Sequence, residues 1–106
     1  MLVTTPSIPG YKVKKVLGVA SGLTARTRGI GGKFIAGFQS LAGGEVTAFT
    51  SELEKARVEA IQRLKDNASR LGANAVLGLD IETTEVFQGT VLISATGTAV
   101  IIEPEQ

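Results

Sequence analysis

A single long stripe of apolar residues constrains this chain more than any other feature. From Val46 to Leu71 the apolar residues recur at steps of three and four, which is the spacing of one face of an α-helix. The members of this stripe are Val46, Phe49, Leu53, Ala56, Ala60, Leu64, Ala68 and Leu71. At 1.5 Å per residue the helix would be about 39 Å long, and Gly72 follows where a left-handed residue commonly ends a helix. A helix of this length in a chain of 106 residues needs a broad sheet to lie on.

Four stretches of the remaining sequence have the pattern of β-strands. They are residues 1–5, Tyr11–Ala20, Ala75–Val86 and Val91–Ile102, with a turn at 87–89 between the last two. Before the long helix, apolar residues at helical spacing predict a short helix over Lys33–Leu41. The expected fold is α+β with element order β-β-α-α-β-β. An antiparallel sheet of about four strands would pack on one long helix, and residues 1–106 would form a single domain.

Alternation along the strands predicts which side chains meet the helix. In the second strand Tyr11, Val13, Leu17 and Val19 would share one face, and in the third Leu77, Leu79 and Ile81 would do so. In the last strand the helix-facing set would be Val91, Ile93, Ala95, Gly97, Ala99 and Ile101, with Ser94, Thr96 and Thr98 facing away. One helix covers only one sheet face, yet Val76, Leu92, Val100 and Ile102 do not suit open water. Together with 43% hydrophobic residues and a mean hydropathy of +0.24, this favours a homo-oligomer.

Several chemistries are excluded by residue types that are missing. The chain has no Cys and no His, which removes thiolate chemistry, the commonest general base and the usual ligands of soft metals. No catalytic constellation is visible, so we expect a protein that is not an enzyme. Five aromatic residues and a pI of about 8.1 give little support to nucleic-acid binding. No apolar run reaches the ~20 residues of a membrane span, and the first residues lack the regions of a secretory signal. A cytoplasmic location is expected.

The charges are distributed unequally along the chain. Residues 1–44 carry six basic residues and no acidic one, whereas residues 45–106 carry five basic and ten acidic residues. Such a division indicates either a basic surface for a ligand or complementarity within or between subunits. Because the charges are few, complementarity is the interpretation that the sequence favours.

Two carboxylates on one strand are the candidate metal ligands. Asp80 and Glu82 are two residues apart, so both side chains lie on the same strand face. With hydroxyl neighbours they could hold a hard divalent cation such as Mg²⁺ or Ca²⁺, and this is the only cofactor that the residues suggest. A solvated strand face explains the same pattern without any ligand.

A basic, glycine-rich segment is the candidate anion site. Arg26, Arg28 and Lys33 lie in residues 26–33, just before the predicted short helix, where backbone amides and basic side chains could converge on a phosphate or nucleotide. The phosphate-loop pattern is not satisfied, because Thr27 and Phe34 stand where Gly and Ser or Thr are required. A connecting loop with scattered bases is the competing interpretation.

Two sequence stretches resemble one known family. Residues 73–82, with Leu71-Gly72 before them, and residues 94–100 (SATGTAV) are similar to the YbjQ-like family, as are Thr4-Thr5 and Gly43-Gly44 before the long helix. The resemblance covers nearly the whole chain. It implies a small α+β subunit of dodecin-like type that assembles into closed rings, typically homopentamers, with a heavy-metal-binding label and no established function.

The expected function therefore combines the resemblance with the residues. We expect a ring-forming binding or scaffold protein whose partner is itself, whose small ligand is unknown, and whose metal-ion binding rests on the resemblance. Soft heavy metals prefer thiolate, thioether or imidazole ligands, and of these only Met1 is present. The alternative function is an anion- or nucleotide-binding module that uses the loop of residues 26–33.

Overall fold

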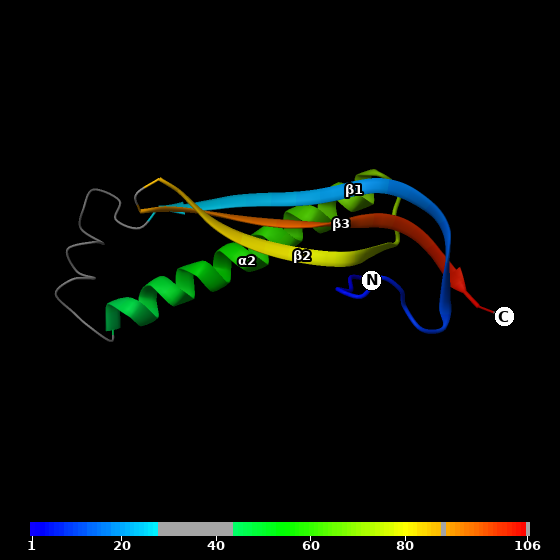
Figure 1. Ribbon diagram of the computed structural model, residues 1–106, viewed down its shortest axis with the longest axis horizontal. Coiled ribbons are helices and arrows are strands. Elements are labelled where there is room, and N and C mark those ends of the chain that lie inside the picture. Colours follow the sequence, from blue (N-terminus) through cyan, green and yellow to red (C-terminus); the bar gives the residue numbers. More distant parts are fainter. Residues whose placement is uncertain (28–43, 88, 106) are drawn as a thin grey trace.

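The structure, a computed structural model that describes residues 1–27, 44–87 and 89–105, has two layers (Figure 1). A three-stranded antiparallel sheet forms one layer and a long helix packs on one face of it. The elements are β1 (Tyr11–Thr27), α2 (Gly44–Arg70), β2 (Ala75–Phe87) and β3 (Thr90–Pro104). The strand order β1-β3-β2 places β3 in the centre and leaves β1 and β2 as edges. The predicted long helix and antiparallel sheet are confirmed.

The number of strands differs from the prediction of four. Residues 1–5 form only an isolated parallel bridge, between Leu2 and Val76. Two backbone bonds form it, from Val76 N to Met1 O at 2.8 Å and from Val3 N to Val76 O at 3.0 Å. Pro6 follows and cannot donate to a ladder, so the segment ends before it becomes a strand. The dodecin-like comparison stays a prediction.

β1 is also longer than predicted, because it continues seven residues past Ala20 to Thr27. Gly22 lies in this extension, and its missing side chain lets the strand approach α2 closely. A Cβ built on Gly22 would lie 2.0 Å from Ala60 O. The predicted helix at Lys33–Leu41 lies outside the described residues.

The helix and the sheet meet through small side chains. Ala56, Ala60, Leu64 and Ala68 form the buried face of α2, as the stripe predicted. They pack with the buried residues Ala20, Val76, Val91, Ile93, Ala95 and Ala99 of the sheet. Because alanine and glycine are small, the backbones of the helix and the sheet lie close together, and much of the core is filled by close backbone packing rather than by large side chains.

Two glycine bulges change which face a strand presents. Gly78 has φ 64° and lies within a register shift between Leu77 and Asp80, so Leu77 packs with Val100 on the face away from the helix. Leu79 and Ile81 pack on the helix side, and the prediction that all three share one face is wrong. A shift beside Gly18 in β1 has the same effect. Leu17 packs towards the helix and Val19 is 76% exposed.

The face of the sheet away from α2 is covered at one end only. Val100 and Ile102 are buried there with Ala75 and Leu77, and half-buried Val3 and Ile8 from the N-terminal segment lie on them. Part of the apolar surface that suggested an oligomer is therefore covered within the subunit. Along β1 on the same face, Val16, Val19 and Leu23 are 62%, 76% and 50% exposed, although Val16 is paired in register with buried Val100. We call this uncovered part, with Ser94, Thr96 and Thr98 of β3, the open face.

The connection from α2 to β2 is held by a helix-ending motif. Gly72 adopts φ 90°, Gly72 N bonds Ser69 O and Ala73 N bonds Ala68 O, as in a Schellman motif. Asn74 then pairs with the backbone of β3, donating to Ile102 O at 3.0 Å and accepting from Ile102 N at 2.8 Å. Among the described residues, no helix is long and apolar enough to cross a membrane.

Candidate functional site

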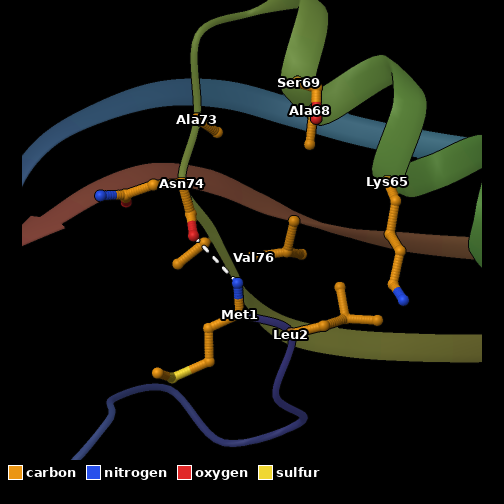
Figure 2. Close-up of a pocket in the computed structure, with 9 residues that line it drawn as sticks. Met1, Leu2, Lys65, Ala68, Ser69, Ala73, Asn74 and Val76 are labelled. Atoms are coloured by element: carbon orange, nitrogen blue, oxygen red, sulfur yellow. Dashed lines mark hydrogen bonds between the residues drawn. The ribbon is translucent and has the colours of Figure 1, made fainter.

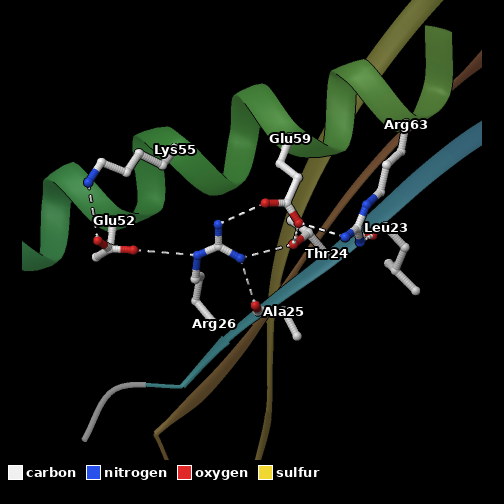
Figure 3. A network of polar contacts seen from close by, with 8 residues as sticks. All are labelled: Leu23, Thr24, Ala25, Arg26, Glu52, Lys55, Glu59 and Arg63. Carbon is white, nitrogen blue, oxygen red and sulfur yellow. Dashed lines mark hydrogen bonds and ion pairs between the residues drawn. The ribbon is translucent and has the colours of Figure 1, made fainter. Parts of the chain in front are cut away.

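In the described part of the chain, a cluster of polar side chains joins the end of β1 to residues 52–63 of α2 (Figure 3). Thr24, which is only 4% exposed, donates to Glu59 Oε1 at 2.8 Å. Arg26 contacts Glu59 Oε2 through Nη2 at 3.1 Å and Glu52 Oε2 through Nε at 3.6 Å. Arg63 completes the cluster, with its Nη2 2.7 Å from Glu59 Oε1. Arg26 therefore joins the strand to the helix by ion pairs with two glutamates, whereas the pair of Arg63 with Glu59 lies within α2.

Glu59 lies at the centre of this cluster, and its neighbours lower the pKa of its carboxyl group. The hydrogen bonds from Thr24 and then Arg26 are the main causes that lower the pKa of Glu59 below its ordinary value, burial opposes them, and the charges of Arg63 and Arg26 lower the pKa further. Hydrogen bonds to the charged form of a carboxylate stabilise that form. Glu59 is therefore a structural anion that stays charged, and it is a poor candidate for a general acid near neutral pH.

The predicted anion site is only partly within the described structure. Arg26 uses its guanidinium on Glu52, Glu59, Thr24 and the backbone oxygen of Ala25. Arg28 and Lys33 lie outside the described residues, so the structure does not bring the three bases together. The anion site stays a prediction.

The predicted cation ligands lie on the open face. Asp80 is paired in register with Thr96, and Glu82 with Ser94, across β2 and β3, so two carboxylates and two hydroxyls share one surface. Both carboxylates are exposed. No group of three or more His, Cys, Asp or Glu that could hold a metal ion occurs within residues 1–27, 44–87 and 89–105. A cation here would need water or hydroxyl ligands to complete its shell.

A hollow of about 460 Å³ lies beside the C-terminal part of α2 (Figure 2). Its lining is formed by Met1, Leu2, Lys65, Ala68, Ser69, Ala73, Asn74, Ala75 and Val76. The amino group of Met1 donates to Asn74 O at 2.9 Å and holds the N-terminal segment against the hollow. Lys65 is the one charged side chain among these lining residues, and none of them is acidic.

Residues 1–103 match the family YbjQ_1, which is described as "Putative heavy-metal-binding". The chain belongs to this family. YbjQ-family relatives that carry the name UPF0145 protein include one from Methanoregula boonei, 45% identical over 105 residues, covering 99% of this chain and 88% of the relative. Another, from a Bradyrhizobium strain, is 43% identical over 104 residues and covers 98% and 94%. The predicted resemblance is confirmed.

A solved structure shares the fold of this YbjQ-family chain. It is a protein with unknown function of the DUF74 family from Pediococcus pentosaceus, with a TM-score of 0.63 and 20% identity, and the match covers 97% of each chain. At this identity the likeness shows the fold alone. Neither this protein nor the UPF0145 relatives carry an activity in their names.

Sequence reasoning missed the cluster around Glu59. The stretch of residues 21–32 contains four glycines and two arginines, a composition typical of a loop, although Thr24 and Arg26 alternate in strand period. Glu52 and Glu59 are seven residues apart, which places them on one side of a helix. These two spacings together could have indicated the cluster, because they place Arg26 on one face of the strand and Glu52 and Glu59 on one side of the helix.

Proposed function

We propose that this YbjQ-family chain is the subunit of a closed homo-oligomeric ring, a pentamer as the resemblance implies, that acts as a binding or scaffold protein. The observation that carries the proposal is the half-covered sheet. α2 covers one face, the N-terminal segment covers one end of the other, and Val16, Val19 and Leu23 remain largely exposed. Apolar side chains clustered on an otherwise polar surface mark an interaction site.

The shape of the subunit supports the same proposal. The chain extends over 60 × 22 × 16 Å, so a third layer that would bury the open face is missing from the described part of the subunit. Two-layer folds bury one face of each element, and further copies of the chain would supply the missing cover. Closed rings are a common outcome when each copy offers two different surfaces to its neighbours.

A hard cation at Asp80 and Glu82 is the metal-binding part of this proposal. The family description concerns heavy metals, but the chain has neither Cys nor His, and soft metals depend on such ligands. Carboxylate and hydroxyl oxygens instead suit Mg²⁺ or Ca²⁺. Titration calorimetry with Mg²⁺, Ca²⁺ and Zn²⁺ on the protein and on Asp80→Asn/Glu82→Gln tests it. Heat that is unchanged in the double variant would reject Asp80 and Glu82 as ligands.

Native mass spectrometry tests the assembly itself. Protein purified without added metal and measured at micromolar subunit concentration should give one dominant oligomer, together with any retained ion or small molecule. Light scattering after size exclusion should give the same mass in solution. An 11.0 kDa species in both measurements would reject the ring.

A further inference from the structure

A further hollow, of about 370 Å³, lies between the edge of β1 and one flank of α2. Residues 21–23 of β1 form one wall, and Arg63, Asp66, Asn67 and Arg70 of α2 form the other. Arg63, Asn67 and Arg70 are four and three residues apart, so they lie on one side of the helix. All of these residues belong to one subunit, so a ligand in this hollow would not depend on the ring proposed above.

The backbone of β1 points its polar groups outward at this hollow, as the bonds of β3 establish. On β3, Asn74 N donates to Val100 O at 3.1 Å, and the Asn74 side chain pairs with the backbone of Ile102. Ser94 shares this direction, towards β2, because residues of a strand alternate and the extra residues at the bulges lie in β1 and β2. Leu23 is the register partner of Ser94. The N–H and C=O of Leu23 therefore point away from β3, to the outer edge of the sheet.

The acceptors on this edge are occupied, whereas a donor between them is not. Asn67 Nδ2 donates to Ser21 O at 2.6 Å, and Arg63 reaches from α2 to donate to Leu23 O (Figure 3). Leu23 N–H lies between these two carbonyls along the edge, and within residues 1–27, 44–87 and 89–105 no acceptor is bonded to it. An amide and a guanidinium, which are themselves donors, therefore flank a free backbone N–H.

Arg70 adds a positive charge that no carboxylate of the described part balances. Its Nη1 donates to Asn67 Oδ1 at 2.9 Å, which leaves the other N–H groups of the guanidinium for a ligand. Asp66 lies four residues before Arg70, but its Oδ1 accepts from Gln62 Nε2 at 3.0 Å and it forms no ion pair with Arg70. The helix wall of the hollow therefore offers charged donors that its own aspartate does not occupy.

We propose that this hollow binds a phosphate group, which accepts from Leu23 N–H, Asn67 and the guanidinium groups of Arg63 and Arg70. Sheet edges with outward N–H groups make anion-binding concavities, and arginine is the preferred side chain for phosphate. The donors approach from the strand edge and from two turns of the helix, which suits the tetrahedral oxygens of phosphate better than the planar pair of a carboxylate. Because Arg63 shares its charge with Glu59, Arg70 supplies the net attraction.

Amide NMR of the isotope-labelled protein, titrated with inorganic phosphate at low ionic strength, tests the site without any variant. The Leu23 amide should shift in a saturable manner, and its exchange with solvent should slow, because the N–H gains an acceptor. The Gly22 amide faces its register partner Ala95 in β3, so its exchange should be slow with and without phosphate. A Leu23 amide that neither shifts saturably nor gains protection would overturn the proposal.

Titration calorimetry with inorganic phosphate on three variants tests the side chains. Arg70→Gln should weaken binding by at least about tenfold, because it removes the unbalanced charge. Arg57→Gln is the matched control, since Arg57 is an exposed arginine of the same helix that pairs with Glu54 outside the hollow, and it should bind as the parent does. Asp66→Asn should bind more tightly, because it removes the one negative charge of the lining. Equal losses in Arg70→Gln and Arg57→Gln would overturn the site, because net charge alone would then explain them.

The choice of ligand and the state of assembly complete the test. Glycerol phosphate and inorganic phosphate should both bind, and the tighter of the two identifies the occupant as a phosphate ester or as the free ion. Acetate that binds as tightly as phosphate would overturn the assignment to phosphate. Phosphate binding by a monomeric protein would reject the ring and keep this site, whereas a ring whose Leu23 amide does not respond would reject the site and keep the ring.

Discussion

Gly22→Ala should force the helix away from the sheet. A Cβ at this position would lie 2.0 Å from Ala60 O and 2.5 Å from Leu64 N. Both atoms belong to the backbone of α2, so no rotation of a side chain can relieve the overlap. Carbon atoms in good contact are about 3.5 Å or more apart, and the strand and the helix would have to separate by more than 1 Å at this point.

The size of the effect follows from that displacement. Overpacking a core usually costs about 1–3 kcal/mol, and Gly22 belongs at the upper end because the obstructing atoms are rigid. For a domain near 100 residues, each kcal/mol lowers Tm by about 4–8 °C. We therefore expect a loss of about 3 kcal/mol and a fall in Tm of about 12–24 °C.

Thermal and urea unfolding at equal subunit concentration measure this loss. Ser21→Ala, one residue away at an exposed position, is the matched control and should change stability by less than about 0.5 kcal/mol. Gly97→Ala offers a graded comparison, because its Cβ would meet a side-chain atom, Val76 Cγ1, at 2.4 Å. If Gly22→Ala melts within 3 °C of the parent, the close contact of β1 with α2 does not exist as described.

Three further outcomes follow from named contacts. Because the folded-state pKa of Glu59 is lowered, the stability that its carboxylate contributes should be complete above the ordinary Glu pKa of about 4.3 and be lost as pH falls through the folded-state pKa. Urea unfolding of Glu59→Gln at a series of pH values should lack this part of the pH dependence. A pH profile of stability identical to that of the parent would contradict the role of Glu59. Asn74→Ala removes both bonds to Ile102 and should cost about 1–3 kcal/mol, against less than about 0.5 kcal/mol for exposed Ser69→Ala. Gly78→Ala should cost about 1–2 kcal/mol through its φ of 64° alone, since nothing lies within 4 Å of the added Cβ; Gly78→Asn should cost less, and equal stability of all three proteins would argue against the bulge.

The elements of this fold were more predictable than the directions of their side chains. The part of the α2 stripe from Leu53 to Ala68 and the helix-facing residues of β3 from Val91 to Ala99 followed from spacing, because neither stretch contains a bulge. The last residue of the predicted stripe, Leu71, lies beyond α2 and is 45% exposed. Faces in β1 and β2 were predicted wrongly because one extra residue at a bulge reverses every later side chain. Gly18 and Gly78 mark those bulges, but a glycine in a strand pattern also marks close approach, which is the role of Gly22 and Gly97.

Of the candidate site residues, the sequence could predict those placed by local alternation but not those brought together by packing. Asp80 and Glu82 lie on one face because they follow the same bulge, so their relative placement depends only on local alternation. The cluster of Thr24, Arg26 and Glu59 needs the extra length of β1 and its packing on α2. Contacts between residues more than 30 positions apart depend on that packing, and no local pattern specifies it.

The alanine-rich contact between α2 and the sheet has a consequence for how the protein persists in dilute solution. Among the residues whose side chains the structure describes, Leu64 and Val100 are the largest that are almost completely buried. Alanine removes little apolar surface from water, so this part of the core contributes only modest folding free energy. If neighbouring copies supply the rest, folding and association become one equilibrium governed by mass action. The midpoint of thermal unfolding then rises with protein concentration, and the abundance of the chain itself sets how much of it remains folded.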